Sequence, residues 1–384
     1  MSRNYLTRSV TTCKYELTYT QGSLRGTFVA DCIKNKIWQG KIVRSNSTPT
    51  VLTDITDLYT KIPLLDSSKK NEILLGLEQA YQQANEFGCQ FNALLTMQQS
   101  KIDFGNKINR TGISLARLSI CDIKKEYHYI DAPMVDNSSE ISSAVERLLQ
   151  KANTNTFQYR DKIKADGVFI LMPQAAGFFI HEILGHLLER DLTFAYKPIY
   201  SMKDYGKQLL PKNVSLYDNP FNLQGINFGI YDDMGNKLTK KCLIKDGVFL
   251  DMITSLRSDS YYKQPECRMY NLCLSGGLSD SEEILRKYPD GILIEDIIAG
   301  GVNPYNGEFL LYCNRALYRE NHEIKGRISN LCIRGSAYSM RDYIIEIGNN
   351  THNFIGYCSK HKQTIPVGNQ TPTLVLYNIS FDQI

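Results

Sequence analysis

The chain has 384 residues, of which 42% are apolar and 22% are charged, so its composition is that of an ordinary globular protein. Forty-four basic side chains are nearly balanced by 40 acidic ones, leaving a formal net charge of +4. This balance argues against a nucleic-acid groove and against a membrane-surface patch, and we expect neither kind of partner. The length is sufficient for two or more domains with sizeable cores.

The cysteines and the apolar runs predict a cytoplasmic protein. None of the ten cysteines falls in a CxxC spacing, and the first thirty residues lack the apolar core of a signal peptide. Reduced cysteines in the cytoplasm are therefore expected. The most apolar window, GVFILMPQAAGFFIHEILGHLL, is interrupted by proline, glutamine, histidine and glutamate. It predicts a buried strand and a buried helix, not a membrane span.

Strands and two helices are predicted in the N-terminal part. Residues 11–60 alternate polar and apolar side chains and are rich in β-formers, which predicts strands. Residues 67–103 are predicted to be helical, and the segment SSKKNEILLGLEQAYQQANEFG opens with capping serines and ends at Gly88. A second helix, in DNSSEISSAVERLLQKANTN, has its cap at residues 137–139. This succession predicts an α+β domain over residues 1–160.

The remainder of the chain predicts one buried helix followed by hairpins. GVFILM is a buried strand, and PQAAGFFIHEILGHLLERD is a helix with Pro173 in its first turn. Beyond residue 225, hairpins are expected at the turns Asp-Met-Gly-Asn, Lys-Asp-Gly, Asn-Gly and Lys-Gly, with one helix in SDSEEILRKYP. The predicted fold class is α+β, with a helix region at 161–224 between the N-terminal strand-helix domain and a largely antiparallel β domain at 225–384.

The buried helix carries His181, Glu182 and His186 within a run of Ile, Leu and Phe. A hydrolytic zinc site needs about three protein ligands and a carboxylate near the attacking water. Zinc proteases commonly place two histidines four residues apart, whereas here the separation is five. On a regular helix, five residues set the two rings roughly 140° apart. A single-turn π-bulge would absorb the additional residue, and Gly185 supplies backbone freedom for it.

Two interpretations of this helix remain open on the pattern alone. In the first, the two histidines bind a metal ion and the glutamate is the general base. In the second, the three side chains form a hydrogen-bonded cluster inside a core, because each would carry a desolvation cost without partners.

The same helix, in AAGFFIHEILGHLLERD, resembles the His-Glu-x-x-x-His helix of the TldD/PmbA family of metalloproteases, in its TldD branch. Four further stretches resemble the family in the same order: GIYDDMGNKLTKKCLIKDGVFLDMITS, CRMYNLCLSGGLSDSEEIL, IAGGVNPYNGEFLLYCNRALYRENHEIKGRI and GYCSKHKQTIPVGNQTPTLVLYNIS. The resemblance covers about residues 160–384. Over residues 1–160 it is limited to a pattern of strands and helices, which indicates a shortened N-terminal domain.

The resemblance implies a zinc site held by His181, His186 and Cys358, the cysteine of the matching Cys-x-Lys ending. A thiolate is a suitable third ligand for such a catalytic set. Glu182 is then the catalytic base, which takes a proton from water and gives it to the leaving amine. Glu189 competes as third ligand, but a role in orienting a ligand, or in an ion pair beside Arg190, is favoured. The histidines at positions 352 and 361 are expected to be exposed or structural.

The implied function is a zinc metallopeptidase that hydrolyses short or unfolded peptides, with peptide maturation or leader removal as a specialised role. Family members pair in the cell, so a homodimer or a heterodimer with a TldD/PmbA-family chain is expected. The alternatives are a catalytically silent PmbA-like partner or peptide-binding subunit, and a hydrolase of non-peptide amides. The intact metal and base residues favour the enzyme. The sequence identifies neither the cleavage site nor the group that stabilises the oxyanion.

Overall fold

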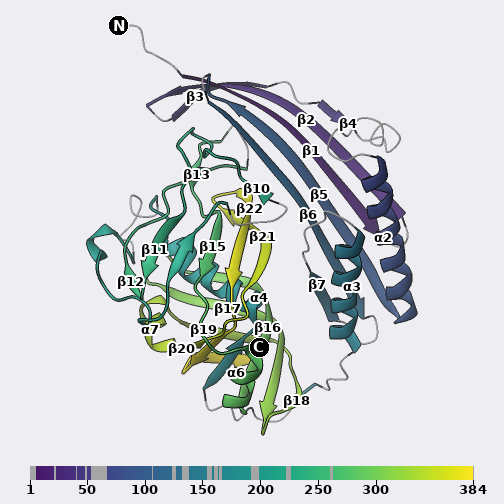
Figure 1. Cartoon of the computed structure of the whole chain (residues 1–384), viewed down its shortest axis with the longest axis vertical. Coiled ribbons are helices and arrows are strands. Elements are labelled where there is room, and N and C mark those ends of the chain that lie inside the picture. Colours follow the sequence, from purple (N-terminus) through teal and green to yellow (C-terminus); the bar gives the residue numbers. More distant parts are fainter. Residues whose placement is uncertain are drawn as a thin grey trace.

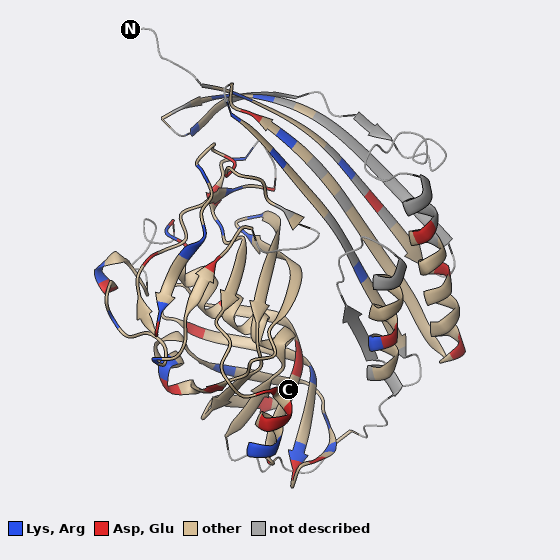
Figure 2. Ribbon diagram, viewed as in Figure 1, with Lys and Arg blue, Asp and Glu red and all other residues tan. Residues whose placement is uncertain are grey.

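Long N-terminal strands arch over a C-terminal β domain, and two helices lie against one end of the arch (Figure 1). The structure is a computed structural model. It describes residues 6–20, 23–39, 41–47, 50–52, 67–105, 107–122, 127–131, 138–153, 158–159, 163, 167–191, 199–221, 226–259 and 263–383. Basic and acidic residues are interspersed along the ribbon (Figure 2), in keeping with the small net charge.

The arch is an antiparallel sheet in the order β10-β6-β5-β1-β2-β3, with β4 beside β2 and β7 beside β6. Its strands are β1 (Leu6–Thr20), β2 (Ser23–Trp38), β3 (Lys41–Ser47), β4 (Thr50–Leu52), β5 (Cys89–Asp103), β6 (Ile108–Asp122), β7 (Tyr127–Asp131) and β10 (Ile226–Asn227). Since β10 comes from the C-terminal half of the chain, main-chain hydrogen bonds join the arch to the rest of the molecule.

Helices α2 (Ser67–Glu86) and α3 (Ser138–Asn153) share a hydrophobic core with one face of the arch. Both predicted helices are thereby confirmed. The helical prediction is wrong for Cys89–Asp103, which forms β5. Gly88 has a φ of +70° and ends the turn after α2, and from there alternate side chains are buried, as a strand requires.

The C-terminal part holds two larger sheets. One has the order β20-β23-β8-β16-β17-β19-β24, with β18 beside β17, and the other has the order β12-β11-β9-β15-β22-β21. Most of their pairings are antiparallel, and β8–β16 and β15–β22 are parallel. The α+β fold class is therefore confirmed.

The strands of the first sheet are β8 (Val168–Leu171), β16 (Gly291–Val302), β17 (Glu308–Glu320), β18 (Glu323–Ile328), β19 (Leu331–Ser336), β20 (Ile344–Ile347), β23 (Leu374–Tyr377) and β24 (Ser380–Gln383). Those of the second are β9 (Leu216–Asp218), β11 (Lys241–Lys245), β12 (Val248–Phe249), β15 (Asn271–Leu274), β21 (His352–Lys360) and β22 (Gln363–Thr371). A two-stranded sheet of β13 (Leu256–Arg257) and β14 (Glu266–Cys267) and the helices α6 (Ser281–Lys287) and α7 (Met340–Tyr343) complete the domain.

The predicted hairpin turns are confirmed with one exception. Asp246 and Gly247, with φ of 49° and 77°, form the tight turn between β11 and β12, as the Lys-Asp-Gly sequence predicts. The Lys-Gly sequence at 325–326 is not a turn, because it lies inside β18. The reversal before β18 falls on Asn321 and His322, with φ of 53° and 67°. Asparagine tolerates this left-handed backbone, which offsets the absence of glycine there.

Helix α4 (Pro173–Ile180) contacts strands of both large C-terminal sheets, and its side chains belong to the main hydrophobic core. Pro173 occupies the first turn, where its missing N–H costs no hydrogen bond. Six of the thirteen residues from Gln174 to His186 are completely buried apolar side chains of this core, so the helix is fixed on several sides. Within the described parts of the chain, no helix is long and apolar enough to span a membrane.

Candidate metal centre

The helix changes its hydrogen bonding where the two histidines lie. After α4 the chain continues as a π-helical turn (His181–Gly185) and then a 3₁₀ turn (His186–Leu188). The N–H of His186 donates to the carbonyl of His181, five residues earlier, which is the bond of a π turn. The imidazole centroids are 5.1 Å apart with an angle of 89° between the rings. The predicted bulge is confirmed, and it brings both rings to one side of the helix.

Close packing explains the glycine in this turn. Gly185 has a φ of −55°, an ordinary helical value, so its backbone conformation does not require glycine. A Cβ at this position would lie 2.7 Å from Leu272 Cδ1 and 2.7 Å from Met269 Sδ. Both of those side chains are completely buried. The expectation that Gly185 serves for backbone freedom is thus incomplete, because its small size also lets the π turn pack directly against β15 and the residues before it.

The third predicted ligand meets the two histidines. Cys358 lies on β21, and its Sγ is 3.3 Å from His186 Nε2. One ligand atom from each of His181, His186 and Cys358 can be chosen so that all three lie within 4.8 Å of one another. The structure therefore assembles the three side chains that the sequence singles out, although one of them comes from near the end of the chain.

This donor set fits a zinc ion. Atoms bound to one tetrahedral zinc, about 2.0–2.3 Å from it, lie roughly 3.3–3.8 Å from one another. The separation of 3.3 Å between Cys358 Sγ and His186 Nε2 already has such a value, and the other separations, which are within 4.8 Å, would need to shorten by at most about 1 Å. Burial alone would raise the pKa of the Cys358 thiol, but hydrogen bonds and charge from His181 and His186 outweigh it and lower that pKa to about 5. The thiolate that a metal requires is therefore the favoured form at neutral pH.

Glu182 lies beside both rings. Its Oε1 is 3.9 Å from His181 Nε2 and its Oε2 is 3.8 Å from His186 Nε2. Burial raises the pKa of this carboxyl above its usual value. Across from it, a Cβ on Gly301 of β16 would lie 3.5 Å from Glu182 Oε2, so the glycine leaves space next to the carboxylate. A carboxylate with a raised pKa and free space at its oxygen is suited to exchange protons with a reacting group.

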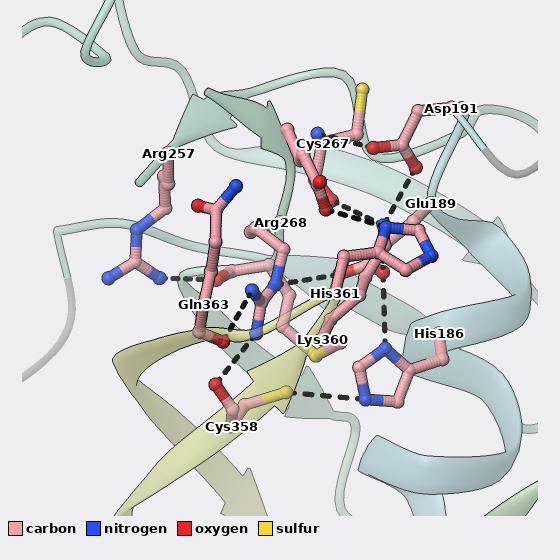
Figure 3. A network of polar contacts seen from close by, with 12 residues as sticks. His186, Glu189, Asp191, Arg257, Cys267, Arg268, Cys358, Lys360, His361 and Gln363 are labelled. Atoms are coloured by element: carbon pink, nitrogen blue, oxygen red, sulfur yellow. Dashed lines mark hydrogen bonds and ion pairs between the residues drawn. The ribbon is translucent and has the colours of Figure 1, made fainter. Parts of the chain in front are cut away.

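Glu189 does not join the donor cluster. Its Oε2 lies 3.1 Å from His186 Nδ1, the ring nitrogen opposite the one that faces Cys358, and its side chain is completely buried (Figure 3). This geometry agrees with the predicted orienting role, because a carboxylate on Nδ1 fixes the tautomer and the direction of the other nitrogen. The cations that face Glu189 are Lys360, at 2.9 Å, and Arg268, at 3.7 Å.

Burial alone would raise the pKa of Glu189, but the charge and hydrogen bond of His186, together with the charges of Lys360 and Arg268, lower it to about 2. Arg268 also donates to the carbonyl oxygen of Cys358, at 2.8 Å. It is therefore a buried support of the ligand strand. Sequence reasoning missed this group of partners, although the Cys-x-Lys pattern placed the lysine on the same face of a strand as the cysteine.

The two histidines near Cys358 lie apart from the donor cluster, as predicted. His352 and His361 are exposed, and His361 Nδ1 is 3.1 Å from Glu266 Oε2. Neither belongs to the set of ligand atoms that the three-residue cluster offers.

Sequence comparison agrees with this geometry. A family model described as the PmbA/TldA metallopeptidase C-terminal domain matches residues 168–383, more than half of the chain. The chain belongs to the TldD/PmbA metallopeptidase family. This match includes the π turn, Glu182 and the cysteine on β21.

Two relatives are named as proteases. A metalloprotease of Methanothermobacter thermautotrophicus is 24% identical over 219 residues, which are 54% of this TldD/PmbA-family chain and 48% of the relative. A zinc metalloprotease TldD homolog of Saccharolobus solfataricus is 26% identical over 239 residues, which are 58% of this chain and 53% of the relative. The chain spans about half the length of the curated relatives it matches.

The fold extends over the whole chain. The crystal structure of TldE from Thermococcus kodakarensis superposes with a TM-score of 0.74, covering 98% of this chain and 96% of that one, at 16% sequence identity. At this identity the likeness concerns the fold alone. It includes the N-terminal arch, where the sequence resemblance is limited to a pattern of strands and helices.

Proposed function

We propose that this chain is a zinc-dependent peptidase that hydrolyses short or unfolded peptides. The observation that carries the proposal is the meeting of His181, His186 and Cys358, with Glu182 3.8–3.9 Å from the two rings. The two imidazoles outweigh burial and lower the pKa of the thiol to about 5, so the thiolate that a metal ion requires is available. Membership of a metallopeptidase family supports the same conclusion.

The protein residues have separate tasks in this reaction. The two imidazoles and the thiolate would hold the metal, and Glu189 would keep His186 oriented from behind. A bound zinc ion would supply Lewis-acid polarisation of the scissile carbonyl and lower the pKa of an attacking water. Glu182, at its Oε2 beside the space left by Gly301, would accept a proton from that water and deliver it to the leaving amine.

A peptide could bind here as an additional strand. β21 is the last strand of its sheet among the described residues, and it carries Cys358. A Cβ added to Gly356, two residues before the thiol, would have no heavy atom within 4 Å. An extended peptide pairs with such an edge through main-chain hydrogen bonds, which suits unfolded substrates of varied sequence. Peptide maturation or leader removal would be one use of such a site.

The location and the assembly of the protein are further parts of the proposal. No disulfide joins any two of the nine cysteines whose side chains the structure describes, which supports a reducing cytoplasm. For the assembly we propose a homodimer, or a heterodimer with another TldD/PmbA-family chain. The second candidate function is a catalytically silent subunit in such a heterodimer. The presence of both a catalytic base and a full set of metal-ligand residues argues against it.

The test combines metal analysis with peptide turnover. The protein and its Glu182→Gln variant are incubated with a library of unstructured peptides, with and without a chelator, and products are read by mass. We expect about one zinc per chain in both proteins and turnover that falls by about 10²–10⁴-fold in the variant. The matched control is Glu86→Gln, an exposed change at the end of α2. Chelator-resistant turnover, or full activity in Glu182→Gln, would overturn the proposal.

A further inference from the structure

Lys360 lies two residues after Cys358 on β21, so the two side chains leave the strand on the same face. The lysine side chain is only 8% exposed. Its Nζ is 2.9 Å from Glu189 Oε2, 2.8 Å from Asp191 Oδ1 and 3.2 Å from the carbonyl oxygen of Cys267 (Figure 3). Three acceptors use the full donor capacity of an ammonium group, so its position is fixed.

One oxygen of Glu189 connects the lysine to the metal centre. Oε2 receives both Lys360 Nζ and His186 Nδ1, at 2.9 and 3.1 Å. The other oxygen, Oε1, has no hydrogen-bond partner among the described residues, and Arg268 Nε is 3.7 Å from it. Without the lysine, the buried carboxylate could turn toward Arg268 and leave Nδ1. The orientation of His186 therefore depends on a residue that it does not touch.

The same two elements meet twice. β21 contributes Cys358 and Lys360, and the end of the helix that carries the two histidines contributes His186 and Glu189. Each of these two elements therefore carries one candidate metal donor and one charged group. The donors face each other at 3.3 Å and the charged groups at 2.9 Å. Asp191 also accepts a hydrogen bond from Lys360. Its other oxygen accepts from the main-chain N–H of Cys267 at 2.8 Å, so strand β14 is connected to the same lysine.

We propose that Lys360 is a positioning residue of the metal centre, which holds Glu189 on His186 Nδ1 and thereby aims Nε2 at the ion shared with Cys358. This inference rests on the proposed metal-binding role of His186 and Cys358. It assigns to the lysine an effect on metal affinity, and not only an effect on folding. Outer-shell partners of metal ligands typically affect affinity or activity by about 10–100-fold.

A double-mutant cycle on zinc affinity tests the assignment. The wild type, Lys360→Met, Glu189→Gln and the double variant are titrated in competition with a chromophoric zinc chelator. Each single variant is expected to bind zinc about 10–100-fold more weakly. If the lysine acts through the carboxylate, the double variant binds within about twofold of Glu189→Gln alone, because the two effects do not add. The matched control is Lys362→Met, an exposed lysine of the same hairpin, with unchanged affinity expected.

A second readout separates positioning from folding. The visible spectrum of the cobalt-loaded protein reports the ligand geometry, and we expect it to change in Lys360→Met and to return toward that of the wild type in Lys360→Arg. If Lys360→Met does not fold, the double variant still tests the proposal, because it removes the buried charges of Lys360 and Glu189 together. Its zinc affinity is then compared with that of Glu189→Gln, and an additional loss beyond twofold would overturn the inference.

The outcomes also distinguish this inference from the proposed function. A wild-type protein that binds no zinc would overturn both. Tight zinc binding by the wild type together with equally tight binding by Lys360→Met would overturn only the positioning role, even if the variant melts at a lower temperature. Weaker binding that is additive with Glu189→Gln would likewise show that the lysine does not act through Glu189.

Discussion

Cys358 Sγ lies 3.3 Å from His186 Nε2, although 172 positions separate the two residues in the chain. The histidine is on the helix that follows β8, and the cysteine is on an edge strand near the end of the chain. The candidate metal centre therefore forms only when the C-terminal domain is folded.

Replacing Cys358 with serine should abolish stoichiometric zinc binding. A serine hydroxyl stays protonated at neutral pH, whereas the metal requires the deprotonated ligand. We expect a loss in zinc affinity that exceeds the 10–100-fold typical of outer-shell changes, with peptide turnover falling in parallel. Zinc per chain after gel filtration is the measurement. Cys242→Ser, at a half-buried thiol outside the donor cluster, is the control and should retain its zinc. A zinc-replete Cys358→Ser protein would contradict the assignment.

Replacing Gly185 with alanine should destabilise the protein, in contrast to the usual effect in a helix. Helix propensity favours alanine by about 1 kcal/mol. Overpacking against Leu272 and Met269, both completely buried and only 2.7 Å from the new Cβ, costs about 1–3 kcal/mol and should win. The free energy of unfolding in denaturant measures the balance. Gly356→Ala, where the Cβ meets nothing within 4 Å, should be nearly neutral, and a more stable Gly185→Ala would refute the packing argument.

Much of the structure of the helix that carries His181 and His186 could be predicted from the sequence. His181 and His186 are too far apart around a regular helix to share one ion, so their spacing predicts a turn that holds one additional residue. The structure has a π turn at this position. The buried environment also followed from the Ile, Leu and Phe run. Local rules were sufficient here because the hydrogen bonds of a helix connect residues that are close in sequence.

Long-range partners could not be predicted in the same way. Nothing in the sequence near Glu189 points to Lys360 or Arg268, because the ion pairs depend on how β21 and β14 dock against the helix end. The strand at Cys89–Asp103 was predicted as helix for a related reason. Its burial alternates because it lies between β1 and β6 in the arch, and those neighbours decide its conformation.

Asn109 joins the arch to the C-terminal domain, and its replacement by alanine should loosen that connection. The side chain is 1% exposed, donates to the carbonyl of Tyr231 at 2.7 Å and accepts from the N–H groups of Ile230 and Tyr231 at 2.7 and 3.2 Å. Its loss removes these three hydrogen bonds to the main chain, each worth about 0.5–1.5 kcal/mol to stability. Faster hydrogen exchange at 230–236 and a lower unfolding free energy are expected. Asn85→Ala, at an exposed helix position, serves as the control, and unchanged exchange in Asn109→Ala would contradict the prediction.

Asp218 should make the protein less stable as the pH rises through the mildly acidic range. Burial raises its pKa from 3.8 to about 6, although two main-chain N–H groups, of Tyr270 and Asn271, donate to its Oδ1 at 2.9 Å. In the folded state the proton is therefore held up to a higher pH than in the unfolded state. The contribution of this group to stability is complete below the unfolded pKa and is lost as the pH rises to about 6, a change of about 3 kcal/mol.

The variant Asp218→Asn isolates this contribution, because an amide oxygen can accept both N–H groups and carries no charge at any pH. We expect the stability of the variant relative to the wild type to rise by about 1.4 kcal/mol per pH unit between pH 4 and 6 and to stay constant above that range. Denaturant unfolding at half-unit pH intervals measures the difference. Asp246→Asn, at an exposed carboxylate in the turn after β11, is the matched control. A difference that is flat, or that falls with rising pH, would mean that Asp218 is better stabilised as a carboxylate in the folded protein than its burial indicates.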